Sequence, residues 1–131
     1  MGYAAAVLWA GWVLNVACGA LAAGEGATPP VYVYHQPGGA GLAYFDPPSK
    51  VMDAEEFHLR MAQALARALG EAGVRAEVVD AEGWLAICRE RRRCAVVDIC
   101  QYPTAALYSG QDEGSPIEEW LDGGGVLIYS G

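Results

Sequence analysis

The apolar positions of this chain follow two spacings, one typical of buried strands and one typical of amphipathic helices. Short apolar runs rich in β-branched and aromatic side chains predict strands. There are four such runs, Val31–His35, Val74–Asp80, Cys94–Cys100 and Val126–Tyr129. The third run is apolar at nearly every position, as expected of a central parallel strand, so Asp98 within it is unusual. A carboxylate there must face the end of the sheet or find hydrogen-bond donors.

The longest predicted helix begins after Asp53, an N-cap residue with Glu56 in the capping-box position, and stops at Gly73. Its expected apolar stripe comprises Phe57, Met61, Ala62, Leu65, Ala66 and Leu69. We expect the other faces to carry His58, Arg60, Gln63 and Arg67. The spacing of the stripe indicates core packing.

Two shorter helices complete the pattern. The first spans Glu82–Arg92 and is expected to bury Trp84, Leu85 and Cys88. The second starts at Pro116, after Ser115 as N-cap and with Glu118 as the capping-box acid. Strands that alternate with helices predict an α/β fold with a parallel sheet and right-handed crossovers. The expected class is a Rossmann-like or flavodoxin-like sheet with flanking helices. We expect the sheet to be truncated after its fourth strand, where no covering helix follows.

The start of the chain differs from the rest. Ala4–Ala23 is a continuous apolar run about as long as one membrane span. Residues 1–23 are therefore interpreted as a signal peptide or an N-terminal membrane anchor, with an apolar core helix as the third reading. Residues 24–30 are interpreted as a linker, and residues 31–131 as the α/β domain. This organisation predicts a protein that is exported, or membrane-anchored with its domain outside the cytoplasm.

Composition narrows the function classes. The chain has 131 residues, of which 53% are apolar, and its 16 acidic and 8 basic residues give a formal charge of −8. This balance argues against a nucleic-acid partner, which requires a basic surface. It also gives no support for electrostatic binding to anionic lipid, so a membrane contact is expected only through the N-terminal segment.

The carboxyl ends of parallel strands meet at one edge of a sheet, and ligands of open α/β sheets bind there. The candidate ligand-binding residues at this edge are His35, Gln36, Asp80, Cys100, Gln101, Ser130 and Gly131. We expect a small molecule or a protein partner at this edge. His35 and Cys100 are weak catalytic candidates, since they could form a thiolate–imidazole pair if their strands are neighbours.

The remaining motifs give weaker indications of a binding site. The glycines of 38–41 lack the spacing of a phosphate-binding loop, so no cofactor is expected. The chain has only two histidines and no CxxC motif, which makes a metal site improbable. Cys88 and Cys94 could form a disulfide or remain two buried thiols. The basic end of the Glu82–Arg92 helix, from Arg89 to Arg93, complements the helix dipole or could bind an anion.

The segment from Ile117 to Tyr129, IEEWLDGGGVLIY, resembles the class I glutamine amidotransferase-like superfamily. There, a helix with a leucine or tryptophan precedes a glycine pair and an aliphatic strand. The resemblance covers roughly Val31–Gly131. Catalytic members carry a cysteine directly after such a strand, where this chain has Ser130 and Gly131. The resemblance therefore implies a non-catalytic relative that acts as a ligand-binding or accessory module.

Two other classes remain open. One is a hydrolase or transferase whose catalytic residues are completed by sequence beyond residue 131, with Ser130 as a weak candidate for an elbow nucleophile. The other is a structural half-domain that needs a partner to complete its sheet.

Overall fold

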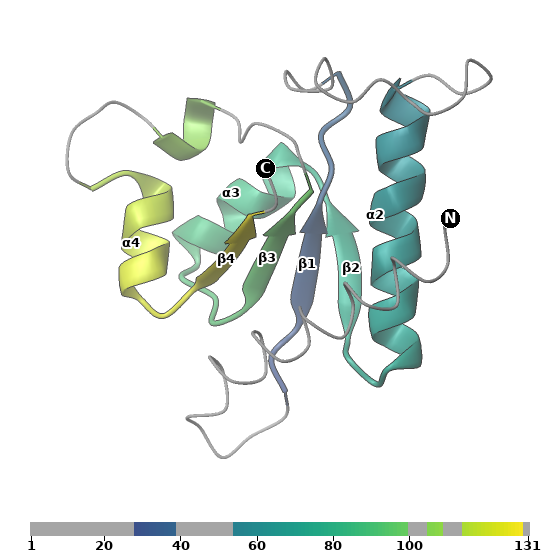
Figure 1. Cartoon of the computed structure of the whole chain (residues 1–131). Helices are drawn as coiled ribbons and strands as arrows, with labels where there is room; N and C mark the ends of the chain where they lie inside the picture. Colours follow the sequence, from purple (N-terminus) through teal and green to yellow (C-terminus); the bar gives the residue numbers. More distant parts are fainter. Residues whose placement is uncertain (1–27, 39–53, 100–104, 109–113, 130–131) are drawn as a thin grey trace.

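Four parallel strands form a single sheet in the computed structural model, which describes residues 28–38, 54–99, 105–108 and 114–129 (Figure 1). The strands are β1 (Val31–Tyr34), β2 (Ala76–Val79), β3 (Ala95–Asp98) and β4 (Val126–Tyr129). Their order in the sheet is β2-β1-β3-β4, and every neighbouring pair is parallel. The predicted α/β class, with a Rossmann-like or flavodoxin-like sheet and flanking helices, is confirmed.

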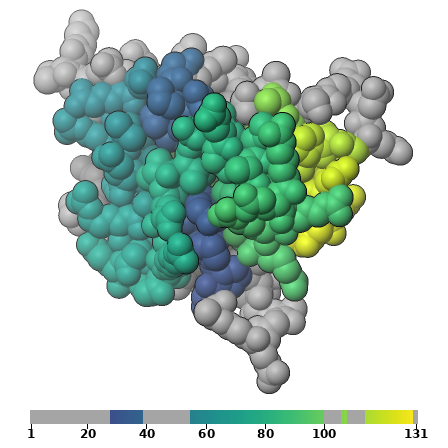
Figure 2. Space-filling model, turned by 180° about the vertical axis from the view of Figure 1, so that it is seen from behind, coloured from purple at the N-terminus to yellow at the C-terminus, as the bar shows by residue number. Residues whose placement is uncertain are grey.

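Helices cover both faces of the sheet. Helix α2 (Ala54–Glu71) lies on one face, and α3 (Ala81–Arg89) and α4 (Pro116–Asp122) lie on the other (Figure 1). Viewed from behind, α3 lies in front of the sheet with α4 beside it (Figure 2). A short 3-10 helix, η2 (Ala105–Tyr108), packs against α3 and α4 and buries Leu107 completely. No helix was predicted for this segment.

Successive side chains of β1 point to opposite faces of the sheet and belong to two separate core layers. Val31 and Val33 face α2 and pack with Leu65 and Leu69, whereas Tyr32 and Tyr34 face α3 and α4. The second layer is completed by bulky side chains from the helices, Trp84, Ile87, Ile117 and Trp120. Since successive strand residues point to opposite faces, residues of β3 and β4 can be assigned to the same two layers.

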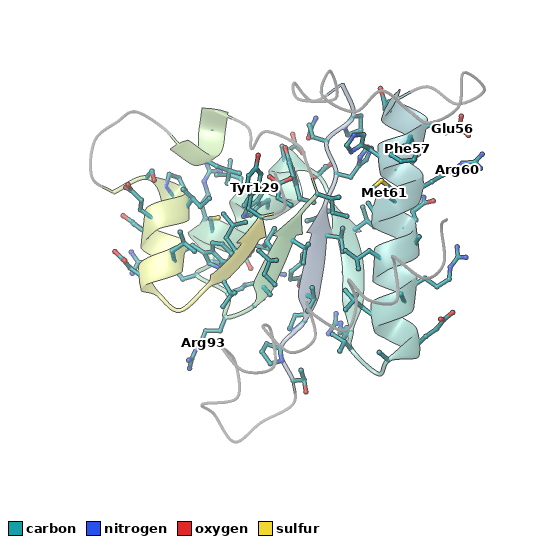
Figure 3. All side chains as sticks on the ribbon, in the orientation of Figure 1. Glu56, Phe57, Arg60, Met61, Arg93 and Tyr129 are labelled. Carbon is teal, nitrogen blue, oxygen red and sulfur yellow. The ribbon has the colours of Figure 1, made fainter. Side chains whose placement is uncertain are left out.

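The apolar stripe predicted on α2 is confirmed for Ala62, Leu65 and Leu69, which are buried. The predicted stripe wrongly left out His58. His58 was expected on another face, yet only 3% of it is exposed. The reason is helical geometry: positions 58, 62, 65 and 69 follow the i, i+4, i+7, i+11 spacing of one face. Phe57 and Met61 flank this face and point toward the sheet, whereas Arg60 points away (Figure 3).

The corner between α4 and β4 is built from three consecutive glycines. Gly124 has a φ of +91°, a conformation that glycine adopts without strain. Gly125 packs directly under the Trp120 ring, and a Cβ at this position would lie 2.1 Å from Trp120 Cε2. The indole Nε1 of Trp120 donates to the carbonyl of Arg92 at 2.8 Å, which fixes the ring over the glycine. The glycine corner is therefore required by packing.

The start of α4 has the predicted capping box. Ser115 Oγ accepts a hydrogen bond from the Glu118 amide at 3.3 Å, and Glu118 Oε2 accepts one from the Ser115 amide at 3.1 Å. The amides of Ser115 and Gly114 both donate to the Glu118 carboxylate, and together with the Ser115 hydroxyl they lower the pKa of this carboxyl.

The predicted signal or anchor segment, residues 1–23, lies outside the described residues, as does most of the predicted linker. The N-cap predicted at Asp53 and the expected end of the domain at residue 131 also lie outside them. Within the ranges that the structure describes, no helix has the length and apolar character needed to cross a membrane.

Candidate functional site

The direction of chain progression through the sheet reverses between β1 and β3. From β1 the chain passes through α2 to β2 on one side, and then through α3 to β3 on the other side of β1. The connecting helices consequently lie on opposite faces of the sheet. In open α/β sheets this reversal point is where ligands bind. We therefore take the carboxyl ends of β1 and β3 as the candidate site.

Two predicted site residues follow β1. His35 is 6% exposed, and its backbone amide continues the sheet by donating to the Val79 carbonyl at 2.9 Å. Gln36 Oε1 accepts a hydrogen bond from the Ala81 amide at 2.9 Å, while Gln36 Nε2 donates to the Pro37 carbonyl at 3.2 Å. The Gln36 side chain thus connects the end of β1 to the first residue of α3.

Asp80, the predicted site residue after β2, caps α3. Its Oδ1 accepts a hydrogen bond from the Gly83 amide at 2.9 Å, and its backbone is extended, as an N-cap residue requires. This cap also explains why β2 ends at Val79, one residue before the predicted end of the strand.

Asp98 occupies the end of β3 and is fully buried. In the sheet it is in register with Tyr34 of β1 on one side and with Tyr129 of β4 on the other. All three belong to the face covered by α3 and α4, because each lies two residues beyond a residue of that layer. A carboxylate between two tyrosines therefore marks the end of the sheet, and the sequence had already singled out Asp98 as unusual.

Exposure increases along this row of side chains toward the edge strand. Tyr34 is 1% exposed and contacts the Trp84 ring edge-on, with ring centroids 4.8 Å apart. Tyr129, at the carboxyl end of β4, is 53% exposed (Figure 3). The row thus combines a buried carboxylate with phenol groups, one of which reaches solvent.

On the opposite face of the sheet, His58 joins the predicted site residue His35. Burial lowers the pKa of His58, and electrostatic repulsion from His35 lowers it further, while a hydrogen bond to the Ile99 backbone opposes these effects. Burial also lowers the pKa of His35, against the attraction of Glu55. Both imidazoles are therefore neutral at pH 7. Sequence reasoning missed His58, although the i, i+4, i+7 spacing contained the signal.

Cys88 and Cys94 are free thiols, and both are buried. The sequence left open a disulfide or two buried thiols, and the structure shows two buried thiols. The pKa of Cys88 is raised to about 11 by burial and by the neighbouring Cys94. Burial likewise raises the pKa of Cys94 to about 11, although Trp120 and Arg92 oppose the shift. Neither thiol is ionised to a useful extent at neutral pH.

The basic turn after α3 lies at the amino edge of the sheet, opposite the candidate site, as the position of Arg93 shows (Figure 3). Arg91 pairs with Glu119 at 2.8 Å and Arg92 pairs with Glu90 at 2.6 Å. These pairs are solvent-exposed and contribute little to stability.

Four predicted site residues, Cys100, Gln101, Ser130 and Gly131, lie outside the described residues. The proposed pair of His35 with Cys100 and the nucleophile role of Ser130 thus stay predictions. In the described part of the chain, no group of three or more His, Cys, Asp or Glu side chains could hold a metal ion. A shallow hollow on α3, lined by Glu82, Leu85, Ala86, Arg89 and Glu90, is formed by that helix and its C-cap alone.

Comparisons of the chain with protein-family models, with curated proteins and with solved structures found no match.

Proposed function

We propose that this protein is a non-catalytic, exported α/β module of the amidotransferase-like type, and that it binds a small polar molecule between the carboxyl ends of β1 and β3. The observation that carries the proposal is the reversal of strand order at this position, with Asp98 and Tyr34 adjacent to each other at the strand ends. In such sheets ligands bind at this reversal point.

The polar groups at this edge favour a ligand that donates hydrogen bonds. Asp98 places a carboxylate at the end of β3, and carboxylates make stronger hydrogen bonds than neutral acceptors do. Tyr129 adds a solvent-exposed aromatic ring and a hydroxyl group at the outer end of the same row. A molecule with amino or hydroxyl groups and a flat apolar part matches this combination.

A binding role fits these residues better than a catalytic one. The thiols of Cys88 and Cys94, with pKa values of about 11, are poor nucleophiles at neutral pH and lie in the layer opposite to His35 and His58. Two further polar side chains at the edge, Gln36 and Asp80, already hydrogen-bond to backbone amides at the start of α3. They shape the edge of the site and are not positioned as acids or bases.

The test is a binding screen on the full chain with amide chemical shifts as the readout. The probes are AMP, FMN, L-glutamine and glucose, each at millimolar concentration. We expect at least one probe to shift amides of residues 34–36 and 98–99, and Asp98→Asn to weaken that binding at least tenfold. The matched control is Arg67→Ala, an exposed position on α2, which should bind as the wild type does. Failure of all four probes to shift these amides, or shifts confined to the outer face of α3, would contradict the proposal.

A further inference from the structure

The two histidines of this chain, its only ones, come together at one corner of the fold. His35 follows β1, and His58 lies near the start of α2, on the helix face directed at the sheet. Both are buried, with exposures of 6% and 3%. His58 also hydrogen-bonds to the backbone of Ile99, the residue after β3. The two imidazoles therefore lie between the start of α2 and the ends of both central strands, and His58 hydrogen-bonds across to the end of β3.

We propose that His35 and His58 form an acid-sensitive latch, in which the two neutral imidazoles hold the start of α2 against the ends of β1 and β3, and protonation of either one releases this corner. A charged imidazole in this position is desolvated by the surrounding core, which is costly. A second charge beside it adds repulsion between like charges. The neutral pair has neither cost and packs as part of the apolar layer.

The charged groups around the pair do not cancel this effect. On α2, Glu55 attracts His35, but the pKa of His35 still lies below its ordinary value because burial dominates. Glu56 forms an ion pair with Arg60 on the exposed side of α2. From β2, Asp80 is engaged in capping α3. From β3, Asp98 points to the opposite face of the sheet. Among the described residues, Glu55 is thus the acid that acts on the pair.

The direction of the pH effect follows from these shifts. Both histidines have folded-state pKa values below 6.5, the ordinary value that applies to the unfolded chain. Below pH 6.5 the unfolded or opened state therefore binds more protons than the closed state, and the closed state loses stability as the pH falls. Above pH 6.5 the contribution of the latch is fully present. The loss continues until the pH reaches the folded-state pKa values.

The experiment measures amide hydrogen exchange of the full chain at pH 7.5 and 5.0, corrected for intrinsic exchange rates. We expect protection of residues 54–65 to fall several-fold at pH 5.0, because the opened corner binds protons that the closed corner does not. Residues 81–89 of α3, on the other face, serve as the internal control and should change less. The double variant His35→Gln/His58→Gln should lose the difference between the two helices.

A second measurement does not require a variant that folds. In the wild type, the two imidazole C2 proton signals can be followed by NMR against pH, and the two titrations should both have midpoints below 6.5. Midpoints at or above 6.5, or equal loss of protection in α2 and α3, would overturn the latch. Neither measurement involves a ligand, so these experiments test the latch independently of the proposed binding function.

Discussion

Replacing Gly125 by alanine is expected to destabilise the fold more than any other single methyl group added at a described glycine. The new Cβ would lie 2.1, 2.4 and 2.5 Å from three ring atoms of Trp120. The ring is fully buried and tied to the Arg92 carbonyl by a 2.8 Å hydrogen bond, so it cannot move aside freely. Overpacking of this kind costs about 1–3 kcal/mol, and loss of the hydrogen bond adds about 1 kcal/mol. We expect a total loss of roughly 2–4 kcal/mol.

The control for Gly125→Ala is Gly70→Ala, which adds the same methyl group to α2. Gly70 is exposed and helical, and a Cβ there has no atom within 4 Å. Alanine at this position should stabilise the protein by about 0.5–1 kcal/mol, because it restricts the unfolded chain and favours the helix. The two substitutions, identical in chemistry, are thus expected to have effects of opposite sign.

Urea denaturation of the full chain, followed by circular dichroism, gives the free energy of unfolding of each variant. If Gly125→Ala lies within about 0.5 kcal/mol of the wild type, the ring moves without cost and the packing explanation of the glycine corner is wrong.

The remaining predictions concern two tryptophans, a helix cap and a thiol. In urea denaturation, Trp120→Phe should lower the free energy of unfolding by about 1 kcal/mol more than Trp84→Phe does. Both rings are fully buried, but only the Trp120 Nε1 has a hydrogen-bond partner among the described residues. Equal losses of stability in the two variants would contradict this explanation. Ser115→Ala should lower the free energy of unfolding by about 1 kcal/mol in the same assay, because the N-cap of α4 is lost. Ser115→Thr keeps a capping hydroxyl and should retain most of the wild-type stability. An alanine variant as stable as the wild type would show that the cap is dispensable. At pH 8, Cys88 should react with a disulfide reagent much more slowly in the native protein than in urea, because the thiol is buried and its pKa is about 11. Equal reaction rates in the native and the unfolded protein would show that the thiol is accessible.

The sequence predicted the order and type of the main elements because each boundary has a local cause. Ser115, Pro116 and Glu118 form a cap that depends only on neighbouring residues, and the structure has it as predicted. The four apolar runs correspond to four strands, although β1, β2 and β3 are shorter than the runs. The end of β2 also has a local cause, because the excess residue Asp80 caps the next helix.

The site was harder to predict because it depends on which strands are neighbours. Alternation of strands and helices does not fix the strand order, so His35, Gln36 and Asp80 could be placed at an edge but not ranked within it. The order β2-β1-β3-β4 places Asp98 beside Tyr34. His58 was missed for a different reason: its polarity suggested an exposed position, whereas its helical phase matches the buried residues of α2.

The best sequence motif and the candidate site lie at opposite ends of the sheet. The glycine corner precedes β4 at the amino edge, whereas Asp98 and Tyr129 lie at the carboxyl edge, across a strand whose four residues span roughly 10 Å. The requirement for Gly125 is explained by the Trp120 ring at its own edge. The effects of substitutions at sites this far apart on the free energy of unfolding are expected to add. The stability cost of Gly125→Ala should therefore be unchanged in an Asp98→Asn background, because the two positions lie at opposite ends of the sheet.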